Sequence, residues 1–272
     1  MLERYKNSYL CYFLMYNFYY LSWAIFSALI SIYLLDKGFK ASEVSLVVST
    51  SFLTSMIFQP VIGMFSDRYD VKKVNFVLFT LAGIGGLAFM FASSLITITI
   101  GYSFVLTLIN GTNPVMEKIA SSSPYQYGKI RIWGTIGYAT GSWLAGMIYQ
   151  LISPSAIFIC FIITMILCII GLLGTQTPSE LGQNNEEKTK TSTLFHNYKY
   201  LYYLIIAAIF QGITNMANTY IPAMFQNDGL KVSLVSTILS FAVLCEAPLV
   251  LFSHKFMDKL TNKRLLIIAY SM

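Results

Sequence analysis

The sequence predicts an all-α integral membrane protein, and two observations support this. Apolar residues make up 56% of the 272 residues and charged residues only 11%, which is too little charge to cover the surface of a water-soluble domain. The apolar residues also gather into stretches of about 20 residues, the length that an α-helix needs to cross a bilayer. The composition therefore excludes a soluble enzyme and a soluble nucleic-acid-binding domain.

Eight such stretches follow one another along the chain, and we expect each to be a membrane-spanning helix. They cover residues 9–35, 43–66, 74–93, 97–119, 130–152, 155–174, 199–225 and 233–256. A ninth begins near Leu265 and stops with the chain at Met272. The first stretch is too long and too aromatic for the core of a cleavable signal peptide, so we interpret it as the first helix.

The basic residues orient the chain in the membrane. With a cytoplasmic N-terminus, 15 of the 18 Lys and Arg residues lie on the cytoplasmic side, and only Lys37, Lys40 and Lys231 lie outside. The positive-inside rule therefore predicts this orientation, and we expect the membrane to be a bacterial inner membrane. The net charge of +6 belongs to these inner loops, so we expect no nucleic-acid partner.

A long internal repeat divides the chain. Residues 38–73 recur as residues 229–264, an offset of 191, with ten identical positions. Self-similarity at a fixed offset marks a repeated structural unit, and two units of this size need about 380 residues. We therefore expect a molecule whose second unit is truncated in this chain.

A polar segment separates the two units. Residues 175–198 contain the only long polar stretch, and we interpret them as a cytoplasmic linker. Residues 1–174 then form a complete six-helix half, and residues 199–272 an incomplete half with helices 7, 8 and the start of 9. In the fifth helix, Gly137 and Gly141 are four residues apart, a spacing that lets a neighbouring backbone approach closely.

The loop after the second stretch carries an acid followed by bases: Asp67, Arg68, Lys72 and Lys73. The pattern recurs 191 residues later, with Asp258 in the place of Asp67. Positive-inside anchoring requires the bases but not an acid at the same register twice. We therefore interpret these residues as a conformational latch between helices.

These features resemble the major facilitator superfamily, whose signature loop G-x-x-x-D-R/K-x-x-x-K/R-K/R is matched by residues 63–73. Within it, the chain is most similar to the lactose permease family of sugar–proton symporters and to their nucleoside-carrying relatives. The similarity is carried by residues 58–60, by the run Tyr-Gly-Lys-Ile-Arg-Ile-Trp-Gly-Thr-Ile-Gly-Tyr at 127–138 and by residues 247–249. It implies the major facilitator fold, with two pseudo-symmetric six-helix halves, a solute site at the midplane and alternating access.

The resemblance assigns a solute-binding set to the first half. Arg131 takes the position of the family's sugar-binding arginine, and a planar guanidinium suits paired hydrogen bonds to neighbouring hydroxyls. The alternative for Arg131 is a positive-inside anchor. Asn113 stands where the family has a substrate-binding acid. Tyr138 matches an aromatic that stacks on the sugar ring, and is otherwise a core aromatic.

Two acids are candidates for proton coupling, because ionisable residues inside a bilayer are costly and mark pathways or proton relays. Glu246 is the only carboxylate at the centre of a predicted helix, the eighth. It is either a titrating proton site or an acid held by hydrogen bonds within the bundle. Glu117, near the end of the fourth helix, is expected to pair with Arg131, because an isolated buried charge is worse than a pair.

Amides complete the candidate site. Asn215 and Asn218 in the seventh helix are three residues apart and share a face, where lactose permease has two acids at this spacing. They either bind a polyol or a nucleoside without titrating or bond to a neighbouring helix. Asn17, inside the first helix, either lines the cavity or bonds to a neighbour.

We therefore expect a secondary active transporter and not an enzyme. It would take up a small polar solute, a sugar or oligosaccharide, together with protons, as a monomer in the lipid bilayer and without a cofactor or metal. Three alternatives stay open: a nucleoside symporter, a proton-antiporting drug exporter, and a truncated product that does not transport and serves at most as a scaffold.

Overall fold

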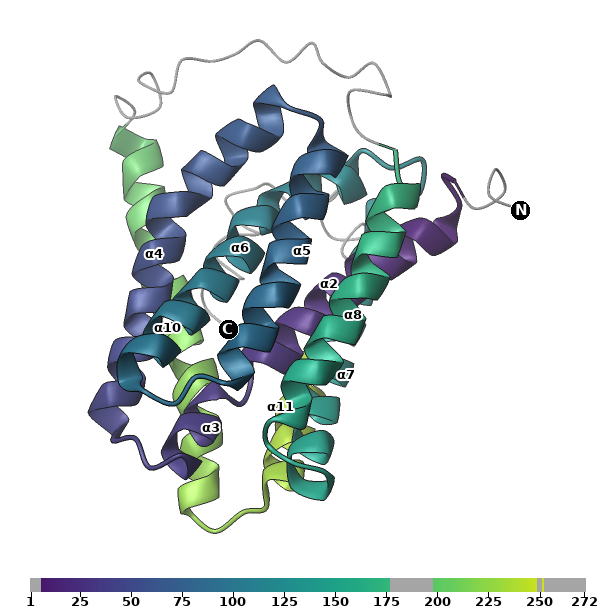
Figure 1. Ribbon diagram of the computed structural model, residues 1–272. Helices are drawn as coiled ribbons and strands as arrows, with labels where there is room; N and C mark the ends of the chain where they lie inside the picture. Colours follow the sequence, from purple (N-terminus) through teal and green to yellow (C-terminus); the bar gives the residue numbers. More distant parts are fainter. Residues whose placement is uncertain (1–5, 177–197, 249–250, 252–272) are drawn as a thin grey trace.

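The computed structural model describes residues 6–176, 198–248 and 251, and these residues form a bundle of α-helices without strands (Figure 1). The helices are α2 (Tyr9–Ser27), α3 (Ile30–Asp36), α4 (Ala41–Arg68), α5 (Val71–Met90), α6 (Leu95–Ser121), α7 (Tyr127–Leu151), α8 (Ala156–Gly174), α10 (Tyr198–Asn227) and α11 (Val232–Leu244). Six spans in the described part are long and apolar enough to cross a membrane, with α2 and α3 counted as one. With α7 and the shorter α11, eight helices match the eight predicted stretches.

The first predicted helix is interrupted near its middle. Residues 28 and 29 form a turn between α2 and α3. The Ser27 hydroxyl donates to the Trp23 carbonyl oxygen at 2.8 Å, a side-chain bond of the kind that bends helices. The helix therefore breaks directly after the polar residue Ser27, although the apolar stretch continues through the break.

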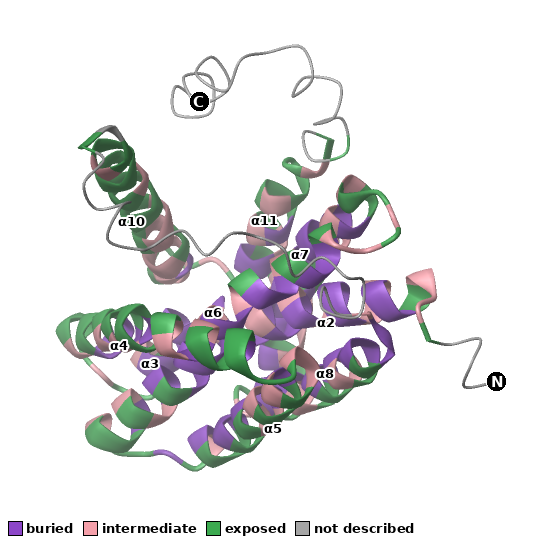
Figure 2. Cartoon of the chain, turned by 90° about the horizontal axis from the view of Figure 1, so that it is seen from above, coloured by how far each residue is buried: buried purple, intermediate pink, exposed green. Residues whose placement is uncertain are grey.

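The core of the first half is built around α2, whose residues are mostly buried (Figure 2). α2 packs on α7 and α8, while α5 packs on α6 and α8. Five aromatic rings from four helices meet in this core, with ring centroids 4.9–6.0 Å apart: Phe26, Phe89, Tyr102, Phe158 and Phe161. Such pairs add to the stabilisation that burial alone gives.

Glycines set the distance between α2 and α7, as the spacing predicts. A Cβ atom added at Gly137 would lie 2.3 Å from the carbonyl oxygen of Asn17, and one at Gly141 would lie 2.5 Å from that of Leu21. Both contacts are with the backbone, which cannot move aside as a flexible side chain does. We therefore expect Gly137→Ala to destabilise the fold by about 2 kcal/mol, the usual range for overpacking.

Thermal unfolding in detergent measures this effect as a lower midpoint for Gly137→Ala. Gly83→Ala in α5 is the matched control, because a Cβ there meets nothing within 4 Å. Equal midpoints for Gly137→Ala and the parent chain would show that α2 and α7 separate without cost.

The repeat in the sequence is also a repeat in the backbone. Gly38 and Gly229 have positive φ angles of 90° and 88°. The amide of Phe39 bonds to the carbonyl of Leu34 at 3.1 Å, and the amide of Leu230 bonds to that of Phe225 at 3.1 Å, again 191 residues later. These are left-handed turns that end one helix and start the next, and they favour glycine because it has no Cβ.

The second half meets the first through two helices, because α11 packs on α7 and α10 packs on α3. The turns at residues 37–40, 91–94, 152–155 and 228–231 gather at one end of the bundle, the lower end in Figure 1, which we call the Asp36 end. The opposite end, with the turns at 69–70 and 122–126, is the Asp67 end. Seen from above, α10 stands away from the first half (Figure 2).

Candidate functional site

A cavity of about 310 Å³ lies between the two halves, a size within the range of small-molecule sites. It is bounded by α2, α4, α6 and α7 of the first half, and by α10 and the end of α11. Its lining residues are Tyr20, Trp23, Ser27, Ala28, Val48, Phe52, Tyr102, Leu106, Asn110, Arg131, Gly134, Thr135, Tyr138, Gln211, Asn215, Asn218, Thr219, Val243 and Glu246.

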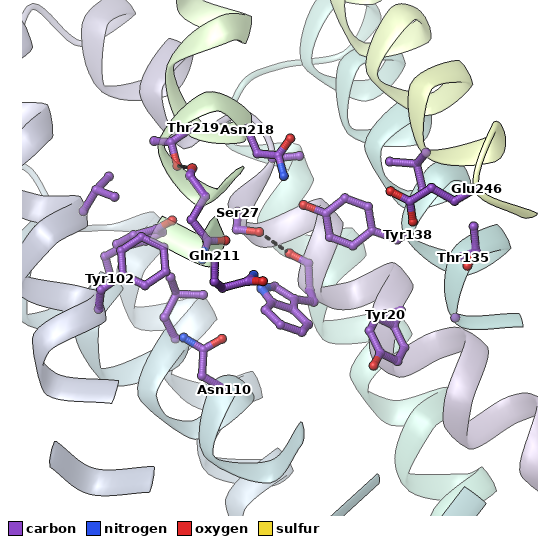
Figure 3. A pocket seen from close by; sticks show the side chains of 18 of the residues that line it. Tyr20, Ser27, Tyr102, Asn110, Thr135, Tyr138, Gln211, Asn218, Thr219 and Glu246 are labelled. Carbon is purple, nitrogen blue, oxygen red and sulfur yellow. Dashed lines mark hydrogen bonds between the residues drawn. The ribbon is translucent and has the colours of Figure 1, made fainter. Parts of the chain in front are cut away.

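The cavity brings together five of the residues that the sequence singles out: Arg131, Tyr138, Asn215, Asn218 and Glu246. Figure 3 shows the amide of Asn218, the ring of Tyr138 and the carboxylate of Glu246 around one space. A guanidinium, amides, a carboxylate and an aromatic face are thus available to a single solute. Such a set can donate and accept hydrogen bonds around a polyhydroxylated molecule.

Helix interruptions place backbone and side chains at this cavity. The turn after Ser27 lines it from the first half, and the turn at Glu246 lines it from the second. Pro114 in α6 removes the hydrogen bond that the Asn110 carbonyl would receive in a regular helix, and the Gln59 side chain donates to that carbonyl at 3.4 Å. Irregular backbone of this kind is tolerated at membrane depth where it lines a cavity.

Glu246 lies at an interruption of the eighth predicted helix, between α11 and a further helical pair at residues 247–248. α11 ends at Leu244, and Cys245 and Glu246 form a turn. The ring of Pro248 clashes with the carbonyl four residues earlier, which is that of Leu244, and so disfavours a regular helix here. The Glu246 side chain is exposed at the cavity and has no hydrogen-bond or ion-pair partner among the described residues.

Glu117 is held by tyrosines and not by Arg131, which corrects the expected pair. Tyr16 and Tyr20 donate to its Oε1 atom at 2.6 and 2.7 Å, and Tyr127 donates to its Oε2 atom at 2.6 Å. The Arg131 guanidinium carbon lies 5.6 Å from the centroid of the Tyr20 ring. The carboxylate of Glu117 thus accepts three hydroxyl groups, and it forms no direct ion pair with Arg131 within the part of the chain described.

Asn17 and Asn113 lie outside the cavity lining. Asn17 is 7% exposed and packs where α2 approaches Gly137, so the glycine contact covers it. Asn113 donates its amide to the Tyr20 hydroxyl at 3.2 Å. Both side chains therefore reach the site only through other residues.

The proposed latch residues lie at the Asp67 end. Asp67 is 3.8 Å from the Lys118 Nζ atom of α6, and both side chains are largely exposed. Asp70 begins α5 by accepting from the backbone amides of Lys72 and Lys73. Arg68 and Lys73 are exposed and Lys72 is half-buried, while Asp258 lies outside the described residues.

Among the described residues, four hydrogen bonds join the two halves at the Asp36 end. Ser31 donates to the carbonyl of Thr219 at 2.6 Å, and the Tyr220 hydroxyl donates to Ser45 at 2.8 Å. The other two bonds run from the Gln226 side chain to Asp36 at 3.0 Å, and from the Ser233 amide to the Gln150 side chain at 2.9 Å. Tyr149 donates to the second oxygen of Asp36.

The sequence reasoning missed several lining residues with polar atoms: Tyr20, Trp23, Ser27, Tyr102, Asn110, Thr135 and Thr219. The sequence did contain a signal for Tyr20. Tyr16 and Tyr20 are four residues apart and therefore share a helix face, and their two hydroxyl groups need polar partners on that face. The lining role of Asn110 and Thr219 depends on the rotation of α6 and α10, which hydropathy does not report.

Comparisons with known proteins agree with this architecture. The sequence model of the family described as Major Facilitator Superfamily matches residues 12–272. Over 255 residues the chain is 27% identical to the uncharacterized transporter YwbF of Bacillus subtilis, covering 90% of this chain and 63% of that protein. It is 26% identical to the raffinose permease of Escherichia coli over 134 residues, 44% of this chain and 31% of the permease.

Among solved structures, the chain is similar to the crystal structure of the nucleoside transporter NupG, with a TM-score of 0.74 and 16% identity. The likeness covers 93% of this chain and 68% of that one. The chain thus spans about two thirds of the length of YwbF and of NupG.

Proposed function

This chain belongs to the major facilitator superfamily, and from that premise we propose that it is part of a secondary active transporter for a small polar solute, moved together with protons. As a multi-pass membrane protein it would lie in the bacterial inner membrane with a cytoplasmic N-terminus. Residues 1–174 would be its first half, 175–198 the linker, and 199–272 part of its second half. A sugar or oligosaccharide is the solute class that we favour.

One observation carries the proposal: the cavity between the halves collects hydrogen-bonding groups of several kinds. Arg131 supplies donors, Glu246 supplies acceptors, and Gln211, Asn215 and Asn218 supply both. Sites that bond hydroxyl groups discriminate strongly against solutes without them, because the buried polar groups are then left unpaired. The match with a raffinose permease over 134 residues supports the same class.

A nucleoside is the second candidate, and the aromatic lining favours it. The Tyr20 and Trp23 rings stack at 5.9 Å with an interplanar angle of 27°, and Tyr102 and Tyr138 also line the cavity. A planar base stacks on such faces, while the amides and Glu246 would bind the ribose hydroxyls. The fold of a known nucleoside transporter is compatible with this reading.

Uptake of radiolabelled solutes into cells that produce the protein tests both classes. The panel contains a disaccharide, a trisaccharide, a purine and a pyrimidine nucleoside, and an aromatic carboxylate as the comparison. We expect saturable uptake of one class that disappears when a protonophore collapses the proton gradient. Absence of both uptake and equilibrium binding across the panel would contradict the proposal.

The arrangement of contacts supports alternating access, with this structure closed at the Asp36 end. Hydrogen bonds join the halves there, whereas residues 208–213 of α10, nearer the Asp67 end, are exposed. With the N-terminus in the cytoplasm, the Asp36 end would face outward and the cavity would open inward. Transport then requires the Asp36 contacts to break in the other state.

Asp36→Ala is expected to favour outward opening, because it removes the hydrogen bond from Gln226 of the second half, whereas the bond from Tyr149 lies within the first half. Asp36 is exposed, so this bond is worth about 1 kcal/mol, and its loss shifts the equilibrium roughly fivefold. The alkylation rate of Thr219→Cys by an impermeant maleimide added outside measures the shift as a rise. Asp228→Ala, which removes an exposed acid at the same end, is the control. Equal alkylation rates in both variants would show that Asp36 does not hold the two halves together.

A further inference from the structure

Among the described residues, Tyr20 combines two hydrogen bonds to α6 with a ring that lines the cavity and contacts Arg131. Its hydroxyl donates to Glu117 Oε1 at 2.7 Å and accepts from the Asn113 amide at 3.2 Å, so it is tied twice to α6. Its ring forms part of the cavity wall, and the Arg131 guanidinium carbon of α7 lies 5.6 Å from the ring centroid. One side chain of α2 thus links two helices and faces the solute space.

The hydrogen-bond pattern at Glu117 fixes the orientation of that ring. Tyr16, Tyr20 and Tyr127 all place hydroxyl groups on the carboxylate, and an ionised carboxylate only accepts hydrogen bonds. The Tyr20 proton is therefore committed to Glu117, which leaves the lone pairs of its oxygen for the Asn113 amide. A tyrosine held by both a donor and an acceptor cannot rotate without losing both bonds.

The fixed ring in turn holds the guanidinium of Arg131 in a defined position. The electron-rich face of a tyrosine attracts a guanidinium within about 6 Å of its centroid. Glu117 adds negative charge at the hydroxyl edge of the ring and forms no direct ion pair with Arg131 among the residues described. The donors of Arg131 thus remain available to a solute.

We propose that Tyr20 is the positioning residue for Arg131: it holds the guanidinium at the cavity edge, oriented toward the solute, through bonds to Glu117 and Asn113. The proposal rests on the proposed function, because it takes Arg131 as a solute ligand. It assigns Glu117 an electrostatic and structural task behind the ring, and leaves Glu246 as the acid that faces the cavity.

Tyr127 offers a matched control for this proposal. It donates to the same carboxylate at 2.6 Å, but it is 43% exposed and does not line the cavity. Tyr20→Phe and Tyr127→Phe each remove one hydroxyl bond to Glu117. Of these two rings, the Tyr20 ring is the one that forms a cation–π contact with Arg131.

Transport kinetics give the first test. We expect Tyr20→Phe to raise KM about five- to tenfold with the maximal transport rate nearly unchanged. The ring is then less firmly positioned, so its cation–π contact with Arg131 weakens, while the fold and the transport cycle are retained. Tyr127→Phe should stay near the parent KM. In an Arg131→Lys background, Tyr20→Phe should add nothing, because the interaction that it supports is already absent.

A second readout needs no solute. The rate at which phenylglyoxal modifies Arg131, measured by mass spectrometry of the protein in nanodiscs, should rise several-fold in Tyr20→Phe and less in Asn113→Ala, and stay unchanged in Tyr127→Phe. If no solute binds but this pattern appears, the proposed function fails and the positioning role stands. If a solute binds and Tyr20→Phe changes neither KM nor Arg131 reactivity, or if Tyr127→Phe changes them equally, the positioning role is overturned.

Discussion

Glu246→Gln is expected to abolish accumulation of the solute against its gradient while leaving exchange of solute across the membrane intact. Glu246 is the only carboxylate that lines the cavity among the described residues, and its side chain has no partner there. Coupling requires a group whose protonation and the bound solute bias the same inward–outward equilibrium. A glutamine keeps the size and the hydrogen-bonding capacity of a protonated glutamate but cannot release the proton.

Two assays separate coupling from binding. Uptake driven by an imposed proton gradient should fall to the level of equilibration, whereas counterflow in proteoliposomes should continue and lose its pH dependence. Asp228→Asn, an acid in an exposed turn, is the control for loss of a single negative charge. If Glu246→Gln accumulates solute as the parent protein does, Glu246 is structural and the proton site lies elsewhere.

Arg131→Lys is expected to weaken solute binding by about two orders of magnitude, although the positive charge is retained. Lysine cannot reproduce the planar fork of donors that a guanidinium presents to neighbouring hydroxyls. Two hydrogen bonds from a charged group, at about 1.5 kcal/mol each, correspond to roughly a hundredfold in the dissociation constant. Binding of labelled solute to the protein in nanodiscs at fixed pH measures the change.

This substitution also decides between the two readings of Arg131 that the sequence left open. A positive-inside anchor at the start of α7 would tolerate lysine, since only its charge matters. Lys129→Ala removes an exposed base two residues earlier in the same helix, and it controls for the loss of a positive-inside anchor. Unchanged affinity in Arg131→Lys would assign Arg131 to anchoring and remove it from the site.

Much of the fold could be predicted because it follows from local properties. Stretches of apolar residues long enough to span a bilayer predicted eight helices, since backbone groups in lipid must be satisfied within each span. The repeat predicted equivalent turns, and Gly38 and Gly229 have nearly the same φ. The break after Ser27 and the end of α11 before Glu246 were missed, because both lie inside stretches that remain apolar.

The candidate site was predictable only in part. The resemblance and the face shared by Asn215 and Asn218 indicated residues that do line the cavity. The positions of Asn17 and Glu117 could not be predicted, because each depends on how one helix is rotated against another. Asn17 is buried because α7 approaches α2 closely at Gly137 and covers this polar residue.

The sequence by itself determined that this chain is a bundle of membrane helices with an internal repeat, because hydropathy, helix length and glycine turns act within short segments. Only the tertiary structure decided that three tyrosines from α2 and α7 meet Glu117 of α6, and that Asp36 joins both halves. Tyr16 and Glu117 are 101 positions apart in the sequence, and Gln226 and Asp36 are 190 apart. Helix crossing and rotation set them, and neither leaves a periodic signal in the sequence of a single helix.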